Sequence, residues 1–172
     1  MIVVGVDPGL KGALCVLPSQ VPLWPSGTFL TPMPTTSGKR PDYDLSAIES
    51  FLKNTVSEGL SRLYVERSQP LPPTMGGSLA NFHRGRSLAL WETLCHCLRI
   101  PVEFVPPQAW QREMLAGCSG DDTKARALQA AQRLFPGLDL SRTPKCKKSD
   151  EGFVDALLIA EFGRRKIAKS GV

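Results

Sequence analysis

The sequence contains no apolar run that approaches the ~18 residues needed to cross a membrane, so a membrane-spanning protein is not expected. It shows no signal peptide, because the residues after Met1 already have the pattern of a core strand. Internal repeats, low-complexity tracts and the glycine–lysine loop of Walker-type nucleotide-binding proteins are also missing. These absences favour a globular protein that works without a membrane and without a small-molecule substrate such as ATP.

Cysteines are few and show no paired spacing. The five cysteines form an odd set, which is typical of a reducing compartment. Cys95 and Cys97 flank His96, a grouping that could suggest zinc. Because residues two apart on a helix point in different directions, the two thiols would not face one ion. A zinc site is therefore not expected here.

Charge is modest in amount but uneven in distribution. The 172 residues are 42% hydrophobic, which favours a single globular domain over residues 1–172. The formal net charge is +5, and 11 of the 21 lysines and arginines lie from Lys124 onward. A basic excess gathered in one part of the chain favours a polyanionic partner.

Hydrophobic periodicity and turn residues predict an α/β protein. The order is three strands, then βα units, and it favours a mixed five-stranded sheet with three antiparallel strands first and helices on both faces. The expected strands are 2–6, 12–17, 28–32, 62–66 and 102–105. The expected helices are 45–56, one from about Ser78 to Leu98, a short piece containing Trp110, one from Asp121 or Asp122 to Phe135, and a last one from Ser149 or Asp150.

Two of the predicted strands end in an acid, and the last helix carries a third. Asp7 ends the first strand, Glu66 ends the fourth, and Asp155 lies among apolar residues of the last helix. A carboxylate at the end of a buried strand is costly unless a cation compensates it. Oxygen-only ligands favour Mg²⁺, for which Mn²⁺ substitutes, and two such ions would suit cleavage of a phosphodiester. Alternatively, Asp7 is an ordinary turn residue bound by the amides that follow it.

The start of the last helix offers two candidates for a fourth ligand. Glu151 lies four residues before Asp155 and shares its helix face. Asp150 lies five residues before Asp155, so in a regular helix its side chain would point to a different face. A residue at the helix cap is not yet helical, however, and could still reach the same ions. For Asp150 the alternative role is to complement the helix dipole and the neighbouring lysines.

Three short motifs resemble the signatures of RuvC-type Holliday junction resolvases. They are GVDPG at 5–9, YVE at 64–66 and DALLIA at 155–160. The intervening features are more similar to the chloroplast-type branch, the monokaryotic chloroplast resolvases and their bacterial and phage relatives. Those features are Ser68-Gln69-Pro70, the glycine loop before the second helix, and Lys147-Lys148 just before Asp150.

The resemblance spans nearly the whole chain and implies an RNase H-like fold, a homodimer, and metal-dependent symmetric nicking of four-way DNA junctions. It implies metal ligation by Asp7, Glu66, Asp155 and a fourth acid, for which the chloroplast-type pattern favours Asp150 over Glu151. One departure concerns position 152, where the RuvC pattern usually has an acid or a histidine and this chain has Gly152.

The resemblance also suggests DNA-binding residues. Lys124 matches a lysine near the active site, where a cation would stabilise charge on the scissile phosphate, although a solvated helix lysine is the alternative. The loop after Glu66 would reach the junction centre, with Phe82 stacking on bases or serving as a packing residue. The apolar helix over 88–98 is either central to the fold or an oligomer face, and in a homodimer it would supply the interface. Trp91 and Trp110 would serve the core or that interface. The DNA-binding candidates are Met75, Gly76, Gly77, Phe82, His83, Arg84, Arg86, Lys145, Lys147 and Lys148.

Other functions remain open at this stage. They are another RNase H-like nuclease of the ribonuclease H or integrase type, a junction-binding protein without catalysis, and an ATP-using relative, which the missing Walker loop disfavours. The expected location is at DNA in a reducing compartment. It would be the chloroplast stroma for a mature plant or algal protein, and otherwise the cytoplasm of a bacterium or of a phage host.

Overall fold

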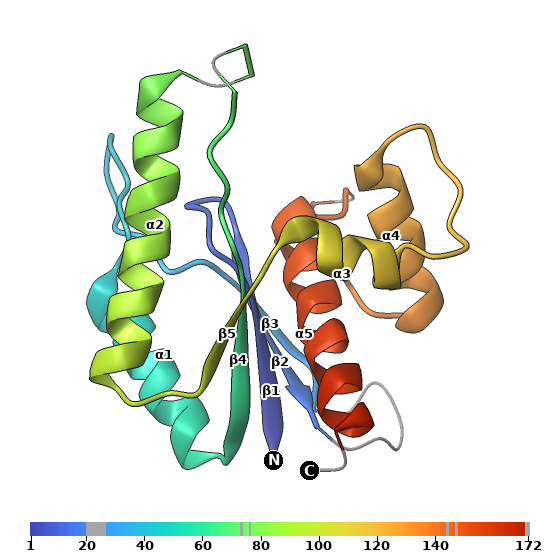
Figure 1. Ribbon diagram of the computed structural model, residues 1–172, viewed down its shortest axis with the longest axis horizontal. Helices are drawn as coiled ribbons and strands as arrows, with labels where there is room; N and C mark the ends of the chain where they lie inside the picture. Colours follow the sequence, from blue (N-terminus) through green and yellow to red (C-terminus); the bar gives the residue numbers. More distant parts are fainter. Residues whose placement is uncertain (20–26, 73, 76, 144, 147, 171–172) are drawn as a thin grey trace.

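The computed structural model describes residues 1–19, 27–72, 74–75, 77–143, 145–146 and 148–170 (Figure 1). Every predicted helix and strand is present, and the short piece around Trp110 is a helix of its own, so three helices follow the last strand. The elements are β1 (Ile2–Asp7), β2 (Ala13–Pro18), β3 (Phe29–Pro32), α1 (Leu45–Ser57), β4 (Leu60–Glu66), α2 (Ser78–Cys97), β5 (Val102–Val105), α3 (Pro107–Met114), α4 (Thr123–Leu134) and α5 (Glu151–Lys169). Within the described ranges, no helix is both long enough and apolar enough to span a membrane.

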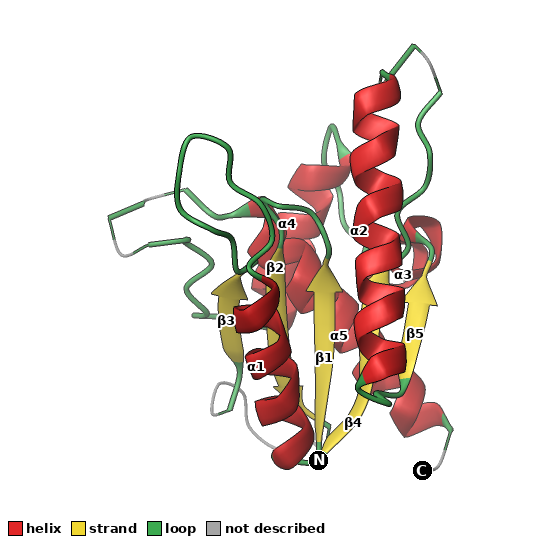
Figure 2. Cartoon of the chain, turned by 90° about the vertical axis from the view of Figure 1, so that its left-hand side faces the viewer, coloured by secondary structure: helices red, strands yellow, loops and turns green. Residues whose placement is uncertain are grey.

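The strands form one mixed sheet in the order β3-β2-β1-β4-β5. Strands β1, β2 and β3 pair antiparallel, whereas β4 and β5 run parallel to β1. The predicted five-stranded mixed sheet is therefore confirmed. Because β1, β4 and β5 are parallel, their carboxyl ends lie at the same edge of the sheet (Figure 2).

Helices cover both faces of this sheet, α1 and α2 on one side and α3, α4 and α5 on the other (Figure 1). Successive residues of a strand face opposite sides, so each strand contributes to two separate cores. Val4, Val6 and Leu63 join the core under α1 and α2. Val3 and Tyr64 join the core under α5.

Helix α5 lies unusually close to the sheet because glycines remove side chains at the contact. A Cβ on Gly5 of β1 would collide with the backbone of Ala156 and Ala160, and one on Gly163 would collide with the ring of Tyr64. Glycine at these positions lets the helix backbone rest directly on β1 and β4. The first turns of α5 are thereby held beside the carboxyl ends of the strands.

The apolar side chains over 88–98 of α2 pack mainly on the sheet of their own chain, as expected for a central helix, and their use in a dimer stays a prediction. Trp91 and Cys95 are buried against the sheet of their own chain, and Glu92 and His96 are exposed. Leu90, Leu94 and Leu98 are partly buried and pack against the same core. Three exposed apolar side chains lie instead in or just before the first turns of α2, namely Met75, Leu79 and Phe82, exposed by 75%, 67% and 65%.

Candidate active site

Asp7 and Glu66 lie next to each other at the shared edge of the sheet. Val6 pairs with Val65 in the parallel register of β1 and β4, so the acids that follow them leave the sheet side by side. The turn after Asp7 is fixed by two buried hydroxyls on the carbonyl of Pro8. Tyr43 donates to that carbonyl at 2.8 Å and Ser87 at 2.7 Å.

Glu66 is oriented by a tryptophan from another element. The indole Nε1 of Trp110, on α3, donates to Oε2 of Glu66 at 2.8 Å. Burial raises the pKa of Glu66, while this hydrogen bond and the positive charge of Arg84 act in the opposite direction. Trp110 is buried, as predicted, and it also contributes a hydrogen-bond donor to the site.

Asp155 completes a group of acids that repel one another. Burial raises its pKa to about 8, and the charges of Asp7 and Glu66 add to that effect. Burial likewise raises the pKa of Asp7 to about 7, with Glu66 as the next contributor. Three largely buried carboxyl groups, from β1, β4 and α5, thus lie within range of one another's charge, and a bound cation would relieve this unfavourable setting.

Asp150 lies at the N-cap of α5, outside the helical phase, as the sequence argument required. Its Oδ1 accepts from the amide of Phe153 at 3.1 Å. Arg142 donates to both of its oxygens, from Nε at 2.6 Å and from Nη2 at 3.0 Å. Although burial opposes ionisation, these hydrogen bonds lower the pKa of Asp150 below its usual value.

Glu151, the alternative fourth ligand, pairs with Lys124. The Nζ of Lys124 lies 2.7 Å from Oε2 of Glu151, and both side chains are largely exposed. Both residues line a groove of about 320 Å³ between α4 and α5, together with Lys148 and Asp155. Lys124 therefore shares this groove with Asp155, and its role at the scissile phosphate stays a prediction.

Gly152 has a steric reason to replace the acid or histidine that the RuvC pattern has there. A Cβ at position 152 would lie 2.8 Å from the carbonyl oxygen of Lys11 and 3.0 Å from Cα of Gly12. These are backbone atoms of the turn between β1 and β2, so they cannot move aside as a flexible side chain would. A larger residue at 152 would push α5 away from β1.

The oxygen atoms of these acids are suitable ligands for a hard divalent cation, although the side chains do not point toward one common position. Among the described residues, no three His, Cys, Asp or Glu side chains are placed so that they could hold an ion as they stand. Glu66 is turned toward Trp110, and Asp150 toward Arg142. Carboxylates that repel one another separate and take other partners when no cation holds them together. The all-oxygen chemistry of Asp7, Glu66 and Asp155 is that of a Mg²⁺ or Mn²⁺ site.

The residues suggested for DNA contact lie around this edge of the sheet with different exposure. Arg84 is exposed on α2, and its charge acts on Glu66. Arg86 forms a bidentate pair with Asp42, at 2.8 and 2.7 Å. Phe82 and His83 are exposed on α2 and contact each other edge to face.

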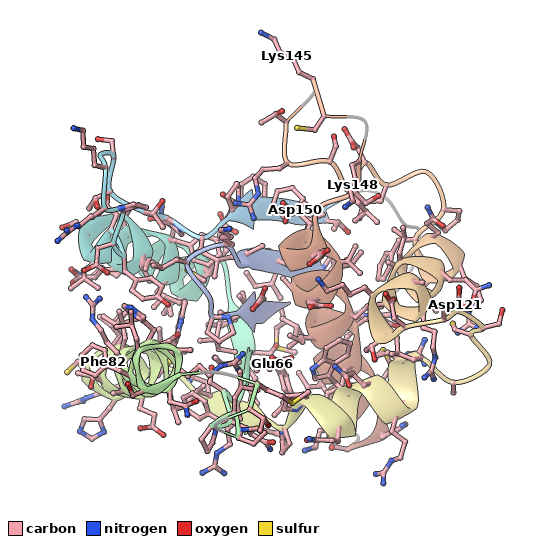
Figure 3. The ribbon with its side chains drawn as sticks, turned by 90° about the horizontal axis from the view of Figure 1, so that it is seen from above. Glu66, Phe82, Asp121, Lys145, Lys148 and Asp150 are labelled. Atoms are coloured by element: carbon pink, nitrogen blue, oxygen red, sulfur yellow. The ribbon has the colours of Figure 1, made fainter. Side chains whose placement is uncertain are left out.

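The two loops that carry the remaining candidates differ in how they are held. Asn81 anchors the loop before α2 by hydrogen bonds to the amide and carbonyl of Leu71, at 2.8 and 3.0 Å. Lys145 extends outward from the loop before α5, and Lys148 lies nearer to Asp150 (Figure 3). Met75 is exposed and Gly77 is the N-cap of α2, whereas Gly76 and Lys147 lie outside the described residues.

Four residues with a part in this site were not predicted for it: Trp110, Arg142, Tyr43 and Ser87. Trp110 was assigned only to packing or to the dimer interface. Arg142 lies within the basic loop over 138–148, and the composition of this loop does not indicate which of its side chains turns toward the acids. Tyr43 and Ser87 donate across 35 and 79 residues of sequence, and no local pattern encodes such contacts.

Comparison with solved structures places the fold. RuvC from T. thermophilus in complex with a Holliday junction substrate is similar with a TM-score of 0.59 and 20% sequence identity, covering 96% of each chain. A second structure of Thermus thermophilus RuvC gives a TM-score of 0.59 and 18% identity, covering 99% of this chain and 97% of that one. No family model and no curated protein sequence matches. The RNase H-like fold expected from the motifs is confirmed.

Proposed function

We propose that this protein is a divalent-metal-dependent DNA endonuclease that resolves four-way junctions by paired symmetric nicks. The observation that carries the proposal is the convergence of Asp7, Glu66 and Asp155 at one edge of the sheet, with the pKa of each raised. The fold is shared over nearly its whole length with RuvC, one structure of which contains a Holliday junction substrate. The finer proposal is a resolvase of the chloroplast-type branch.

The proposed cofactor is Mg²⁺, or Mn²⁺ in its place, with two ions per site held by Asp7, Glu66, Asp155 and Asp150. Such ions stabilise charge on the attacking and leaving oxygens while water acts as nucleophile. Trp110 orients Glu66, and the hydroxyls on the Pro8 carbonyl fix the turn that carries Asp7. If Asp150 keeps its hydrogen bonds to Arg142, Glu151 is the alternative fourth ligand of the metal ions.

The basic residues around the site would bind the DNA backbone. Lys124 and Lys148 line the groove beside Asp155, so a phosphate near the carboxylates would meet their charges. Arg84 would approach from α2 on the other side. Phe82 is exposed near the start of α2 and would stack on bases near the crossover.

Paired nicks need two sites related by a two-fold axis, and we therefore propose a homodimer. Trp91 and Cys95 are buried within their own chain and would take no part in its interface. The exposed apolar side chain of Leu79, in the first turn of α2, is a better candidate.

A cleavage assay on three substrates tests this function. A four-way junction, a linear duplex of the same sequence and an RNA–DNA hybrid are incubated with the protein, with and without Mg²⁺. We expect paired nicks on the junction alone, and only with the metal. Preference for the hybrid would favour a ribonuclease H-type enzyme, and junction binding without cleavage would favour a non-catalytic binding protein.

A further inference from the structure

Arg142 connects three segments at the candidate metal site. Its guanidinium holds both oxygens of Asp150, and its Nη2 also donates to the carbonyl of Lys11 at 2.6 Å. The basic loop, the turn after β1 and the start of α5 therefore meet on one side chain. Arg142 is 32% exposed and Asp150 is 18% exposed, so the pair is shielded but within reach of solvent.

The same guanidinium reaches the turn that follows Asp7, because its Nη2 also lies 3.4 Å from the carbonyl oxygen of Gly12. The charges of Asp150 and Arg142 both act on the carboxyl group of Asp7, one repelling and the other attracting. Arg142 is thus a cation that bridges the turn after β1 and the N-cap of α5. A metal ion bound by Asp150 would compete with Arg142 for the same carboxylate oxygens.

Asp150 has little capacity left for a metal in this arrangement. One of its oxygens accepts from Arg142 and from the Phe153 amide, and the other accepts from Arg142. A bidentate arginine–carboxylate pair is among the stronger ionic hydrogen bonds in proteins. An ion approaching Asp150 would therefore have to displace the guanidinium.

We propose that Arg142 is a positioning residue that takes the place of the second metal ion in the free protein. While Arg142 holds Asp150, the carboxylates of Asp7, Glu66 and Asp155 bind one divalent cation. The second cation binds when Arg142 leaves Asp150 for a DNA phosphate, a ligand that matches its fork geometry equally well. This inference rests on the proposed metal-dependent function and adds an order of binding to it.

Mn²⁺ binding to the DNA-free protein, measured by electron paramagnetic resonance of the free ion, tests the inference. Wild-type protein should bind one ion, and Arg142→Ala should bind two, with the second ion about 10- to 100-fold tighter than in wild type. Arg142→Ala combined with Asp150→Asn should return to one ion. Arg133→Ala is the matched control: it removes the same charge from an arginine that donates to the Ala116 carbonyl, and it should behave as wild type.

Two outcomes separate this inference from the function on which it rests. Equal Mn²⁺ binding by wild type and Arg142→Ala, or a gain that survives Asp150→Asn, would overturn the role of Arg142 and leave the nuclease proposal standing. Failure of every variant to bind Mn²⁺ would instead count against the metal site itself. If Arg142→Ala does not fold, judged by circular dichroism, Arg142→Lys replaces it: a second ion tighter than in wild type supports the inference, and unchanged binding overturns it.

Discussion

Trp110 is a core residue that acts on the site directly, through its hydrogen bond to Glu66. The indole hydrogen bond works against the rise that burial causes in the pKa of Glu66. Trp110→Phe removes the donor and keeps most of the ring, so the pKa of Glu66 should rise further. We expect cleavage to fall about 10- to 100-fold, and the acidic limb of its pH–rate profile to move to higher pH.

A second buried tryptophan provides the matched control for that change. Trp91 is fully buried, and its Nε1 has no hydrogen-bond partner among the described residues. Trp91→Phe therefore perturbs packing without removing an oriented donor, and the acidic limb should stay in place. Equal displacement of the limb in both variants would show that Trp110 acts through packing alone.

Gly152 gives a second prediction at the residue scale. Gly152→Ala places a methyl group against the backbone of Lys11 and Gly12, and should lower the free energy of unfolding by about 1–3 kcal/mol. Gly85→Ala is the control, since a Cβ at that position on α2 meets nothing within 4 Å. It should leave stability unchanged or raise it by about 0.5–1 kcal/mol, because alanine favours the helix. Equal stability of the two variants in urea unfolding would contradict the steric account of position 152.

At the scale of elements, α2 divides into two parts with different roles. Its later part, with Trp91 and Cys95, belongs to the core, whereas its first turns carry exposed Leu79 and Phe82. The exposure of Phe82 disfavours the alternative that it is an ordinary packing residue. The first turns of α2 are therefore available to contact DNA or a second subunit.

Phe82→Ala tests the use of this exposed end. Stacking on a base is worth about 1–3 kcal/mol, whereas phosphate contacts supply most of the affinity. We expect cleavage to fall and sequence preference to blur, with a smaller loss of junction binding and an unchanged unfolding temperature. Phe29→Ala, which removes an exposed aromatic from edge strand β3, is the control and should cleave as wild type does. Identical cleavage rates and sites in the Phe82 and wild-type proteins would remove Phe82 from the DNA-binding set.

The elements also show what sequence patterns encode. Short apolar runs ending in Asp7 and Glu66, and capping residues such as Asp150, were enough to predict the strands, the helices and the mixed sheet. The same patterns predicted that Asp7 and Glu66 lie close together, because the carboxyl ends of parallel strands lie at one edge of the sheet. The pattern of α2 left open whether its leucines serve the core or a dimer interface, because a helix that is apolar around much of its surface does not reveal which face meets the sheet. The partners of Glu66 and Asp150 could not be predicted, because Trp110 and Arg142 reach them through tertiary contacts.

At the scale of the whole molecule, the carboxylate group should make stability depend on pH. Asp7 and Asp155 have ordinary pKa values near 3.8 in the unfolded chain, and about 7 and about 8 in the fold. At pH values between the unfolded and the folded pKa, the folded protein keeps protons on these carboxyl groups that the unfolded chain has released. The free energy of unfolding of the metal-free protein should therefore fall as the pH rises from about 4 to about 8.

Urea unfolding in the presence of a chelator, at several pH values within that window, measures this dependence. Asp155→Asn should flatten it, because one of the two raised groups is gone. For the wild-type protein, excess Mg²⁺ should raise the free energy of unfolding at the upper end of the window, because the ion binds the ionised carboxylates of the folded state. Stability that rises with pH across the window without metal would contradict the raised pKa values of Asp7 and Asp155 in the fold.

The central claim is that Asp7, Glu66 and Asp155 form a metal-dependent nuclease site, and Asp7→Asn tests it most directly. Four-way junction binding and Mg²⁺-dependent nicking are measured on the same preparation, with Asp121→Asn as the control. Asp121 is exposed in the turn before α4, where the same substitution leaves the carboxylate group intact (Figure 3). We predict that Asp7→Asn reduces nicking at least ~100-fold while junction binding stays near wild type, because the basic surface is unchanged. Nicking by Asp7→Asn at the wild-type rate would contradict the claim.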